Sequence, residues 1–269
     1  MAADLVRQEP TAACATAAIV VRDLTKRFGN TLAVDHVSFR VARGRFFGFL
    51  GPNGAGKSTT MKMLTGLLQP TAGDVTIEGI ALATDPLAIK GLIGVVPEEL
   101  PLYERLTGDE YLTFAGRMYG LKRAQVRERV DEILAFLALT TERDRLIVDY
   151  SLGMKKKLAL AAALLHNPRV LFLDEPLNGI DPVSARVVSD LLRRVADKGA
   201  TIFFTSHALD VVERLCDEVA IIDRGRIVAQ GSLDEIRSQR TLAQDTSLED
   251  IFLKLVAADV TRQDLSWIG

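Results

Sequence analysis

The segment at residues 51–58, GPNGAGKS, has residue types and spacing suited to binding a phosphate chain. It matches the pattern G-x-x-x-x-G-K-[ST]. Glycines permit positive φ angles and close backbone approach, so that successive N–H groups and a helix N-terminus face the anion. We expect Lys57 to reach the β- and γ-phosphates, Ser58 to bind Mg²⁺ and Thr59 to donate to the α-phosphate. The other predicted nucleotide contacts are Gly51, Asn53, Gly54, Ala55 and Gly56.

Two acids follow a later apolar segment. The run VLFLDEP places Asp174 and Glu175 at the carboxyl end of a predicted buried strand, where α/β sheets hold ligands. Carboxylate oxygens suit Mg²⁺, which we expect Asp174 to hold through water. Glu175 is predicted to orient and deprotonate a water that attacks the γ-phosphate in line. A capping or turn role is the alternative. A small GTPase is disfavoured because no N-K-x-D segment is present.

A second candidate anion site lies at residues 150–157, YSLGMKKK. A helix that starts near Gly153 presents free N–H groups and the positive end of its dipole, and Ser151 adds a hydroxyl. Lysines are unfavourable at a helix N-terminus unless an anion arrives there. The alternative is that Ser151 only caps the helix and that the lysines form a solvated face.

Composition limits the function classes. The chain has 269 residues, 48% hydrophobic and 25% charged, with a net charge of −2, so a soluble α/β protein is expected and a nucleic-acid partner is not. Cys14 and Cys216 suggest neither a disulfide framework nor a metal site. No apolar run approaches the roughly 18 residues needed to span a bilayer. Residues 1–16 lack the charge pattern of a secretory signal and are predicted to form a flexible tail.

The apolar patterns predict strands and helices in alternation. Strand-like runs occupy residues 19–50 with a turn at 26–30, and a strand is expected at 73–79. Helices are expected at 57–67 and within 108–139. Between two buried strands, a helix should start at Asp181 and stop at Gly199. Its predicted apolar face consists of Val183, Val187, Leu191 and Val195.

Two further features lie near the C-terminus. The run VAIIDRGRIVAQG predicts a hairpin that turns at Arg224 and Gly225. The last helix is expected to begin with a capping box of Thr246 and Glu249.

These motifs, in this order, resemble those of ATP-binding cassette (ABC) ATPases. The phosphate loop comes first, YSLGM precedes the acidic strand end, and TSH at 205–207 follows it; the match runs from about residue 17 to 238. The resemblance implies an α/β fold: a P-loop NTPase core with a mostly parallel sheet, an N-terminal antiparallel β-subdomain and an inserted helical subdomain at about 98–165. Residues 17–238 would form the ATPase domain and 239–269 a C-terminal helical extension.

The resemblance also explains two phosphate motifs in one chain. In this family two cassettes stack head to tail, and each closes a signature segment over the nucleotide held by the other. That segment would comprise Ser151, Leu152, Gly153 and Met154. Phe28 occupies the position of the adenine-stacking aromatic, His207 that of the histidine bridging γ-phosphate, water and glutamate, and Asp181 that of the partner-facing D-loop aspartate. A core role for Phe28 and a helix-capping role for Asp181 are the alternatives.

Two positions depart from the family pattern. The usual glutamine after a proline is Glu98 here, which retains a Mg²⁺-binding carboxylate but loses the amide donor. We expect Glu98 to keep the metal and coupling role while altering the hydrolysis rate. Leu152 replaces the first glycine of the signature, and it suits the site only in a right-handed conformation. Met154 replaces the usual glutamine.

Longer segments resemble ATPase subunits of bacterial exporters of the ABC-2 type. Such a subunit would lie at the cytoplasmic face of the membrane, pair with a second ATPase subunit, expected to be identical, and drive a separate membrane permease with ATP and Mg²⁺. Soluble non-transport ABC ATPases and non-hydrolysing regulatory subunits are the alternatives. The permease would contact an apolar patch, for which core packing is the alternative. The candidate residues are Pro101, Leu102, Tyr103 and Leu106.

Overall fold

The structure is a computed structural model that describes residues 17–239 and 246–256. Its strands are β1 (Ala17–Phe28), β2 (Thr31–Ala42), β3 (Phe46–Leu50), β4 (Ala72–Ile77), β5 (Ile80–Ala81), β6 (Ile93–Val96), β7 (Val170–Asp174), β8 (Thr201–Ser206), β9 (Glu218–Asp223) and β10 (Arg226–Gly231). Its helices are α1 (Lys57–Leu64), α2 (Pro86–Leu92), α3 (Gly108–Met118), α4 (Arg123–Phe136), α5 (Leu152–Leu164), α6 (Pro182–Asp197), α7 (Leu209–Leu215), α8 (Leu233–Gln239) and α9 (Leu248–Val256).

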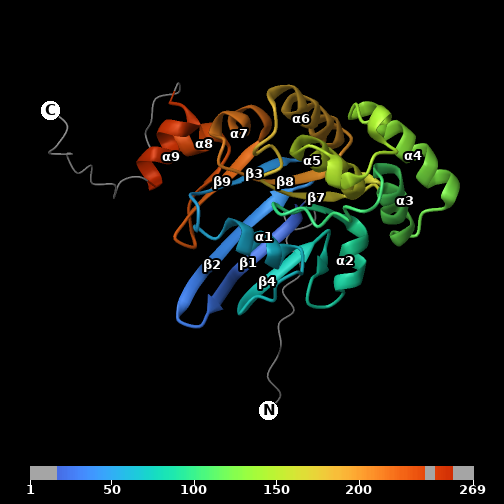
Figure 1. Cartoon of the computed structure of the whole chain (residues 1–269). Coiled ribbons are helices and arrows are strands. Elements are labelled where there is room, and N and C mark those ends of the chain that lie inside the picture. The colour runs from blue at the N-terminus through green and yellow to red at the C-terminus, as the bar shows by residue number, and fades with distance from the viewer. Residues whose placement is uncertain (1–16, 240–245, 257–269) are drawn as a thin grey trace, which may run out of the picture.

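The strands form two sheets. An antiparallel sheet has the order β2-β1-β4-β5, and a six-stranded sheet has the order β10-β9-β3-β8-β7-β6. In the larger sheet β9, β3, β8, β7 and β6 pair in parallel, while β10 pairs antiparallel with β9. Figure 1 shows the antiparallel sheet on one side of the larger sheet and helices α6 and α7 on the other. The predicted fold class, with an N-terminal antiparallel part and a mostly parallel core, is confirmed.

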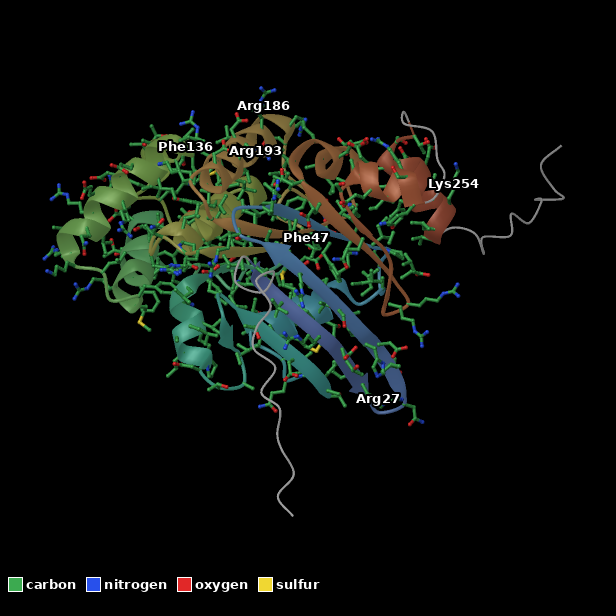
Figure 2. The ribbon with its side chains drawn as sticks, turned by 180° about the vertical axis from the view of Figure 1, so that it is seen from behind. Arg27, Phe47, Phe136, Arg186, Arg193 and Lys254 are labelled. Carbon is green, nitrogen blue, oxygen red and sulfur yellow. The ribbon has the colours of Figure 1, made fainter. Side chains whose placement is uncertain are left out.

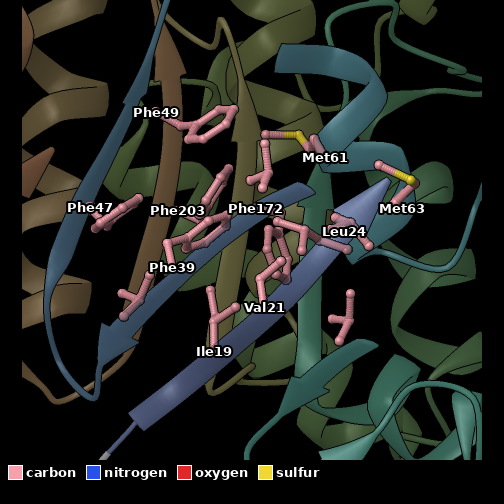
Figure 3. Packing of buried hydrophobic residues seen from close by; sticks show 14 of the residues in the cluster. Ile19, Val21, Leu24, Phe39, Phe47, Phe49, Met61, Met63, Phe172 and Phe203 are labelled. Atoms are coloured by element: carbon pink, nitrogen blue, oxygen red, sulfur yellow. The ribbon is translucent and has the colours of Figure 1, made fainter. Parts of the chain in front are cut away.

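Strand β3 divides the core because its alternate side chains point to opposite faces. Phe47 and Phe49 face the antiparallel sheet, and Phe46 joins the cluster under the helices on the other side. Phe39 of β2 stacks on Phe47 and on Phe203, with ring centroids 5.6 and 5.8 Å apart (Figure 3). Aromatic contacts of this kind join the two sheets and fix the strand that leads into the phosphate loop.

Helices α3 and α4 lie at one end of the molecule, away from α8 and α9, and α5 packs between them and the larger sheet (Figure 1). They have their own apolar cluster, to which Leu112, Val126, Val130, Leu134 and Leu158 contribute. Thr107 begins α3 with a capping box: its hydroxyl accepts from the Glu110 N–H, and the Glu110 carboxylate accepts from the Thr107 N–H. The boundaries of a helical subdomain at about 98–165 stay a prediction.

The predicted face of α6 is wrong in part. Val183 is 74% exposed, and the buried stripe runs through Val188, Leu192 and Ala196. Val187 and Leu191 pack beside the cluster of the neighbouring helices instead. The outer face carries charge, as Arg186 and Arg193 show in Figure 2. Sequence periodicity identified an apolar helix but did not say which of two adjacent stripes faces the sheet.

Smaller differences concern element ends. Strand β1 continues to Phe28, so the turn expected at residues 26–30 consists of Gly29 and Asn30 only. The first helix ends at Leu64 rather than near residue 67. The cap of α9 is shifted by one residue from the predicted Thr246 and Glu249: the Ser247 hydroxyl accepts from the Asp250 N–H at 3.1 Å. The hairpin turn at Arg224 and Gly225 is confirmed, with φ of 46° and 81°.

The predicted tail at residues 1–16, which includes Cys14, lies outside the described residues, as do residues 240–245 and 257–269 of the predicted extension. Among the helices that the structure describes, none is long and apolar enough to cross a membrane.

Candidate functional site

The glycine-rich loop connects β3 to α1. Gly54 and Gly56 have φ of 80° and 109°, a region that side chains other than glycine adopt at a cost. A Cβ added to Gly51 would lie 2.3 Å from the Ile222 carbonyl oxygen, so the loop also needs glycine for close packing on β9. The Lys57 ammonium donates to the carbonyl oxygens of Gly51 and Pro52 at 2.8 and 3.2 Å. The loop therefore curls around its lysine at the N-terminus of α1.

A cavity of about 600 Å³ opens in front of this loop. It brings together residues from distant parts of the sequence, and most of them are predicted site residues. The lining consists of Ala33, Gly51, Pro52, Asn53, Gly54, Gly56, Lys57, Ser58, Thr59, Glu98, Glu175, Asn178, His207 and Phe252.

The two acids lie where the sequence predicted, at the end of β7. Asp174 and Glu175 are 5% and 6% exposed. The Thr205 hydroxyl on β8 donates to the Asp174 carboxylate and accepts from the Glu175 N–H at 3.1 Å. Glu175 has φ of 48°, a left-handed conformation that is uncommon for a residue with a Cβ. This backbone turn directs the chain away from the strand immediately after the acid pair.

His207, just past the end of β8, lies against Glu175. Its Nδ1 is 2.9 Å from the Glu175 Oε2, and its main-chain N–H donates to the same oxygen at 3.4 Å. The Glu175 side chain is 8% exposed and the imidazole 55% exposed. The pair thus has the geometry of a general base held by a histidine, at the wall of the phosphate-loop cavity.

The residues present fit a nucleotide-bound Mg²⁺. Ser58 and Glu98 line the same cavity and offer hard oxygen ligands, and Asp174 adds a buried carboxylate beside it. Mg²⁺ is commonly held by one or two carboxylates together with substrate phosphates. The described residues contain no cluster of three or more His, Cys, Asp or Glu that would hold a different metal without a nucleotide.

The second anion segment begins α5, away from the cavity lining. The Ser151 hydroxyl caps the helix and accepts from the Met154 N–H at 3.3 Å. Leu152 is the first helical residue and does not have a positive φ, so it meets the condition for replacing a glycine here. A Cβ added to Gly153 would lie 3.6 Å from a carboxylate oxygen of Asp181. The first turn of α5 therefore packs near the start of α6.

The lysines of this segment do not form one solvated face. Lys155 lies 2.6 Å from the Glu104 carboxylate. Lys156 and Lys157 are 7% and 8% exposed. The suggestion of a solvated lysine face is therefore wrong for Lys156 and Lys157.

Asp181 caps α6, and its carboxylate accepts from the Ser184 N–H at 2.9 Å. Hydrogen bonds from the Ser184 main chain and hydroxyl hold the pKa of Asp181 below its usual value. The capping alternative is thus correct in geometry, and it leaves the carboxylate at the surface. Phe28 is 49% exposed at the end of β1, outside the cavity lining, with the Lys26 ammonium 5.1 Å from its ring centroid.

The four candidate docking residues divide into two kinds. Leu102 and Leu106 are partly buried and pack against the cluster of α3, α4 and α5, so core packing describes them better. Pro101 and Tyr103 are exposed. The Tyr103 ring lies against Phe114 of α3 in an edge-to-face contact with centroids 5.5 Å apart. Four large side chains on or beside α3 are exposed, namely Tyr103, Phe114, Met118 and Tyr119, and among them Tyr103 and Phe114 are in contact.

Sequence reasoning missed several residues of the site. Thr205 was part of the TSH segment but was given no role, although its hydroxyl joins the two acids. Phe252 of α9 lines the cavity and carries no motif. Lys156 was visible only as one lysine of three, and its burial depends on backbone carbonyls brought to it by the fold. The one signal in the sequence was that Lys156 lies at the start of a long apolar helix.

A glycine-rich loop between a parallel strand and a helix, with an acid pair at the end of another parallel strand of the same sheet, defines a P-loop nucleoside triphosphatase. A family model described as ABC transporter matches residues 34–178, more than half of the chain. The chain belongs to the ABC transporter family, as a subunit that binds and hydrolyses ATP.

Similar proteins agree with this assignment. The linearmycin resistance ATP-binding protein LnrL of Bacillus subtilis is 38% identical over 227 residues, covering 84% of this chain and 72% of that protein. The daunorubicin/doxorubicin resistance ATP-binding protein DrrA of Streptomyces peucetius is 40% identical over 83% of this chain and 68% of its own length. A solved ATP-binding subunit of an ABC transporter has a TM-score of 0.83 and 34% identity, covering 88% of this chain and 99% of that one.

Proposed function

We propose that this chain is the motor subunit of an exporter, in which two copies sandwich two Mg·ATP and drive a separate membrane permease. The observation that carries the proposal is the contact between His207 Nδ1 and Glu175 Oε2 at 2.9 Å beside the phosphate loop. A buried carboxylate with a half-exposed imidazole at a phosphate cavity suits hydrolysis rather than binding alone. ATP binding would bring the two copies together, and hydrolysis would release them.

Within one copy, each predicted residue has a task. Lys57 and the loop N–H groups would bind the β- and γ-phosphates, and Thr59 the α-phosphate. Glu175 would accept a proton from the attacking water, while His207 holds that carboxylate and faces the γ-phosphate. Mg²⁺, held by Ser58, Glu98 and Asp174, would neutralise charge on the phosphate oxygens. Phe28 would stack on the adenine from the β1–β2 hairpin.

The second copy would supply the other half of each site. The N-terminus of α5 carries Ser151 and the positive end of the helix dipole, but Ser151 and the first turn of α5 do not line their own cavity. We assign Ser151, Leu152, Gly153 and Met154 to the nucleotide of the partner copy. Asp181 lies beside Gly153 and would face the partner with it. This division explains why one chain carries two phosphate motifs.

The permease would contact the exposed side chains on and beside α3, which are Tyr103, Phe114, Met118 and Tyr119. Met118 is 72% and Tyr103 58% exposed, and the Tyr103 ring contacts Phe114, so apolar surface is available to a partner here. Pro101 is exposed two residues before Tyr103, whereas Leu102 and Leu106 are partly buried against the cluster of α3, α4 and α5. The chain would thus sit at the cytoplasmic face of the membrane by binding a partner. The names of the two resistance proteins favour export of a toxic small molecule.

The test is Glu175→Gln, which keeps the shape of the side chain and removes the base. Saturated with Mg·ATP, this variant should form a stable dimer in light scattering, whereas Glu175→Gln combined with Ser151→Arg should stay monomeric. Turnover should fall in the single variant by roughly 10²- to 10⁴-fold, the usual contribution of a general base. A strictly monomeric Glu175→Gln protein, both in solution and beside its permease, would refute the composite site.

A further inference from the structure

Lys156 is a buried cation next to the catalytic loop. Its ammonium donates to the Glu175 carbonyl oxygen at 2.8 Å and to the Asn178 carbonyl oxygen at 2.5 Å. The Glu175 carbonyl also accepts from the Asn178 N–H at 3.2 Å, which closes a tight turn. A single side chain of α5 therefore ties together both ends of the turn that begins at Glu175.

This turn includes a backbone conformation that needs support. Glu175 has φ of 48°, and such a conformation persists at non-glycine residues only where the surroundings hold it. On the strand side, Thr205 accepts from the Glu175 N–H through its hydroxyl and its main-chain oxygen, at 3.1 and 3.2 Å. On the other side, Lys156 binds the Glu175 carbonyl. The peptide groups that flank the Glu175 side chain are thus held from opposite directions.

Helix α5 contacts the same loop a second time, at its N-terminus. Gly153 lies near Ile180 and Asp181, since a Cβ added to it would be 3.7 and 3.6 Å from their side-chain atoms. Lys156 follows Gly153 by three residues, which is less than one helical turn. The segment from Glu175 to Asp181 is therefore fixed to the first two turns of one rigid helix.

We propose that Lys156 is a positioning residue for Glu175: its ammonium holds the turn that aims the carboxylate at the attacking water, and it ties that turn to the signature helix. The inference rests on the proposed function, in which Glu175 is the base and the N-terminus of α5 binds the nucleotide of the partner copy. A displacement of α5 on binding that nucleotide would be transmitted through Lys156 to Glu175 of the same copy. Lys156 itself does not line the phosphate-loop cavity.

The electrostatic setting agrees with this role. Burial lowers the pKa of the Lys156 ammonium, and the negative charges of Glu175 and Glu98 raise it in opposition. A buried cation needs hydrogen-bond acceptors, and the carbonyl oxygens of Glu175 and Asn178 are the acceptors of Lys156. The cation also offsets the repulsion between Glu175 and Glu98, which line one cavity. Loss of the ammonium would therefore disturb the aim of Glu175 and the charge balance around it.

The experiment compares three substitutions at position 156 in the full chain. Lys156→Met removes the donors and keeps the length, Lys156→Gln keeps a donor without charge, and Lys156→Arg keeps both. Steady-state hydrolysis gives kcat and KM for ATP, and a fluorescent ATP analogue gives nucleotide affinity. Lys155→Met is the matched control, because Lys155 lies on the same helix and pairs with Glu104 instead. Thermal unfolding of each variant checks that it is folded.

In Lys156→Met we expect kcat to fall on the order of 10²-fold, the cost of misplacing a catalytic group by about 1 Å, while affinity for the ATP analogue stays unchanged. Lys156→Arg should recover most of the rate and Lys156→Gln part of it, and Lys155→Met should match the wild type. A folded Lys156→Met protein with normal kcat, or one in which KM rises instead of kcat falling, overturns the positioning role.

If Lys156→Met does not fold, Lys156→Arg and Lys156→Gln still test the role of Lys156. In that case a folded Lys156→Arg or Lys156→Gln protein with no recovery of rate also overturns the role. Glu175→Gln distinguishes a failure of the proposed function from a failure of the role assigned to Lys156. An active Glu175→Gln protein would refute the proposed function, whereas an inactive one beside a fully active Lys156→Met would refute the inference about Lys156 only.

Discussion

Oε2 of Glu175 accepts two contacts from His207: the imidazole Nδ1 lies 2.9 Å away and the main-chain N–H donates at 3.4 Å. The main-chain bond places the histidine at the end of β8 directly beside the acid at the end of β7, and these strands pair in parallel. The contact through Nδ1 leaves the other ring nitrogen, Nε2, for a contact with a phosphate. The pair is therefore suited to stabilising charge on the γ-phosphate while it holds the base.

Replacing His207 with alanine should impair hydrolysis more than binding. We expect kcat to fall by roughly 10²-fold, within the usual range for a group that assists proton transfer, because Glu175 loses its side-chain partner. Affinity for a fluorescent ATP analogue should stay close to the wild-type value, since the phosphate loop is intact. Phosphate release under saturating Mg·ATP measures the rate.

His36→Ala is the control for that experiment, because His36 is exposed, pairs with Asp35 and does not line the phosphate-loop cavity. It should leave kcat unchanged. A His207→Ala protein with wild-type turnover would show that the 2.9 Å contact serves no catalytic purpose.

Glu98→Gln tests the departure from the family pattern. Glu98 lines the phosphate cavity together with Glu175, so a neutral amide removes one negative charge from the metal side of the site. We expect the Mg²⁺ concentration at half-maximal rate to rise several-fold, because an amide oxygen binds a hard cation more weakly than a carboxylate does. The hydrolysis rate at saturating Mg²⁺ should also change. Unchanged values of both would remove Glu98 from the metal site.

Phe28→Ala should weaken ATP binding by about tenfold, as expected if a base stacked on an aromatic ring contributes ~1–3 kcal/mol. The ring is 49% exposed at the end of β1, so its removal leaves the core intact. Phe28→Tyr should retain affinity, because stacking needs the ring face and no hydroxyl. Equilibrium titration with a fluorescent ATP analogue measures the effect, and an unchanged dissociation constant in Phe28→Ala would place adenine elsewhere.

The sequence was sufficient to predict turns and helix caps, which depend on a few neighbouring residues. The turn at Arg224 and Gly225 requires positive φ at two adjacent residues, and Gly54 and Gly56 meet the same demand in the phosphate loop. The cap at Asp181 followed from an acid before a proline. Each of these features depends on a few neighbouring residues, so one sequence was enough to place it.

Features decided by tertiary contacts were predicted less well. Val183 and Val188 are both apolar residues of α6, and only the position of the larger sheet decides that the second is buried. Likewise, nothing in KKK says that Lys155 meets Glu104 while Lys156 meets carbonyl groups from residues 175 and 178. The choice between docking and core packing for Leu102 was likewise open in the sequence, because the cluster of α3, α4 and α5 that contacts it comes from other parts of the chain.

Stability should depend on pH through His166. Its ring stacks on Tyr119 with centroids 3.7 Å apart, and its Nε2 lies 2.9 Å from the Ile93 carbonyl oxygen. Among the described residues, its Nδ1 is a buried polar atom with no hydrogen-bond partner. Burial lowers the pKa of His166 below the ordinary 6.5, and the nearby Arg129 lowers it further, while the Ile93 hydrogen bond raises it. Protonation would thus place an unpaired charge at Nδ1.

The direction of this pH dependence follows from the difference between the pKa of His166 in the folded and the unfolded chain. Because the native pKa is the lower one, the unfolded chain binds the proton more readily, and stability rises with pH in that interval. The contribution of His166 is therefore complete above pH 6.5 and is lost as the pH falls through the unfolded and then the folded pKa. His166→Phe keeps a ring to stack on Tyr119 but cannot titrate. Urea unfolding at a series of pH values should show the wild type losing more stability below pH 6.5 than His166→Phe, and parallel curves would contradict this assignment.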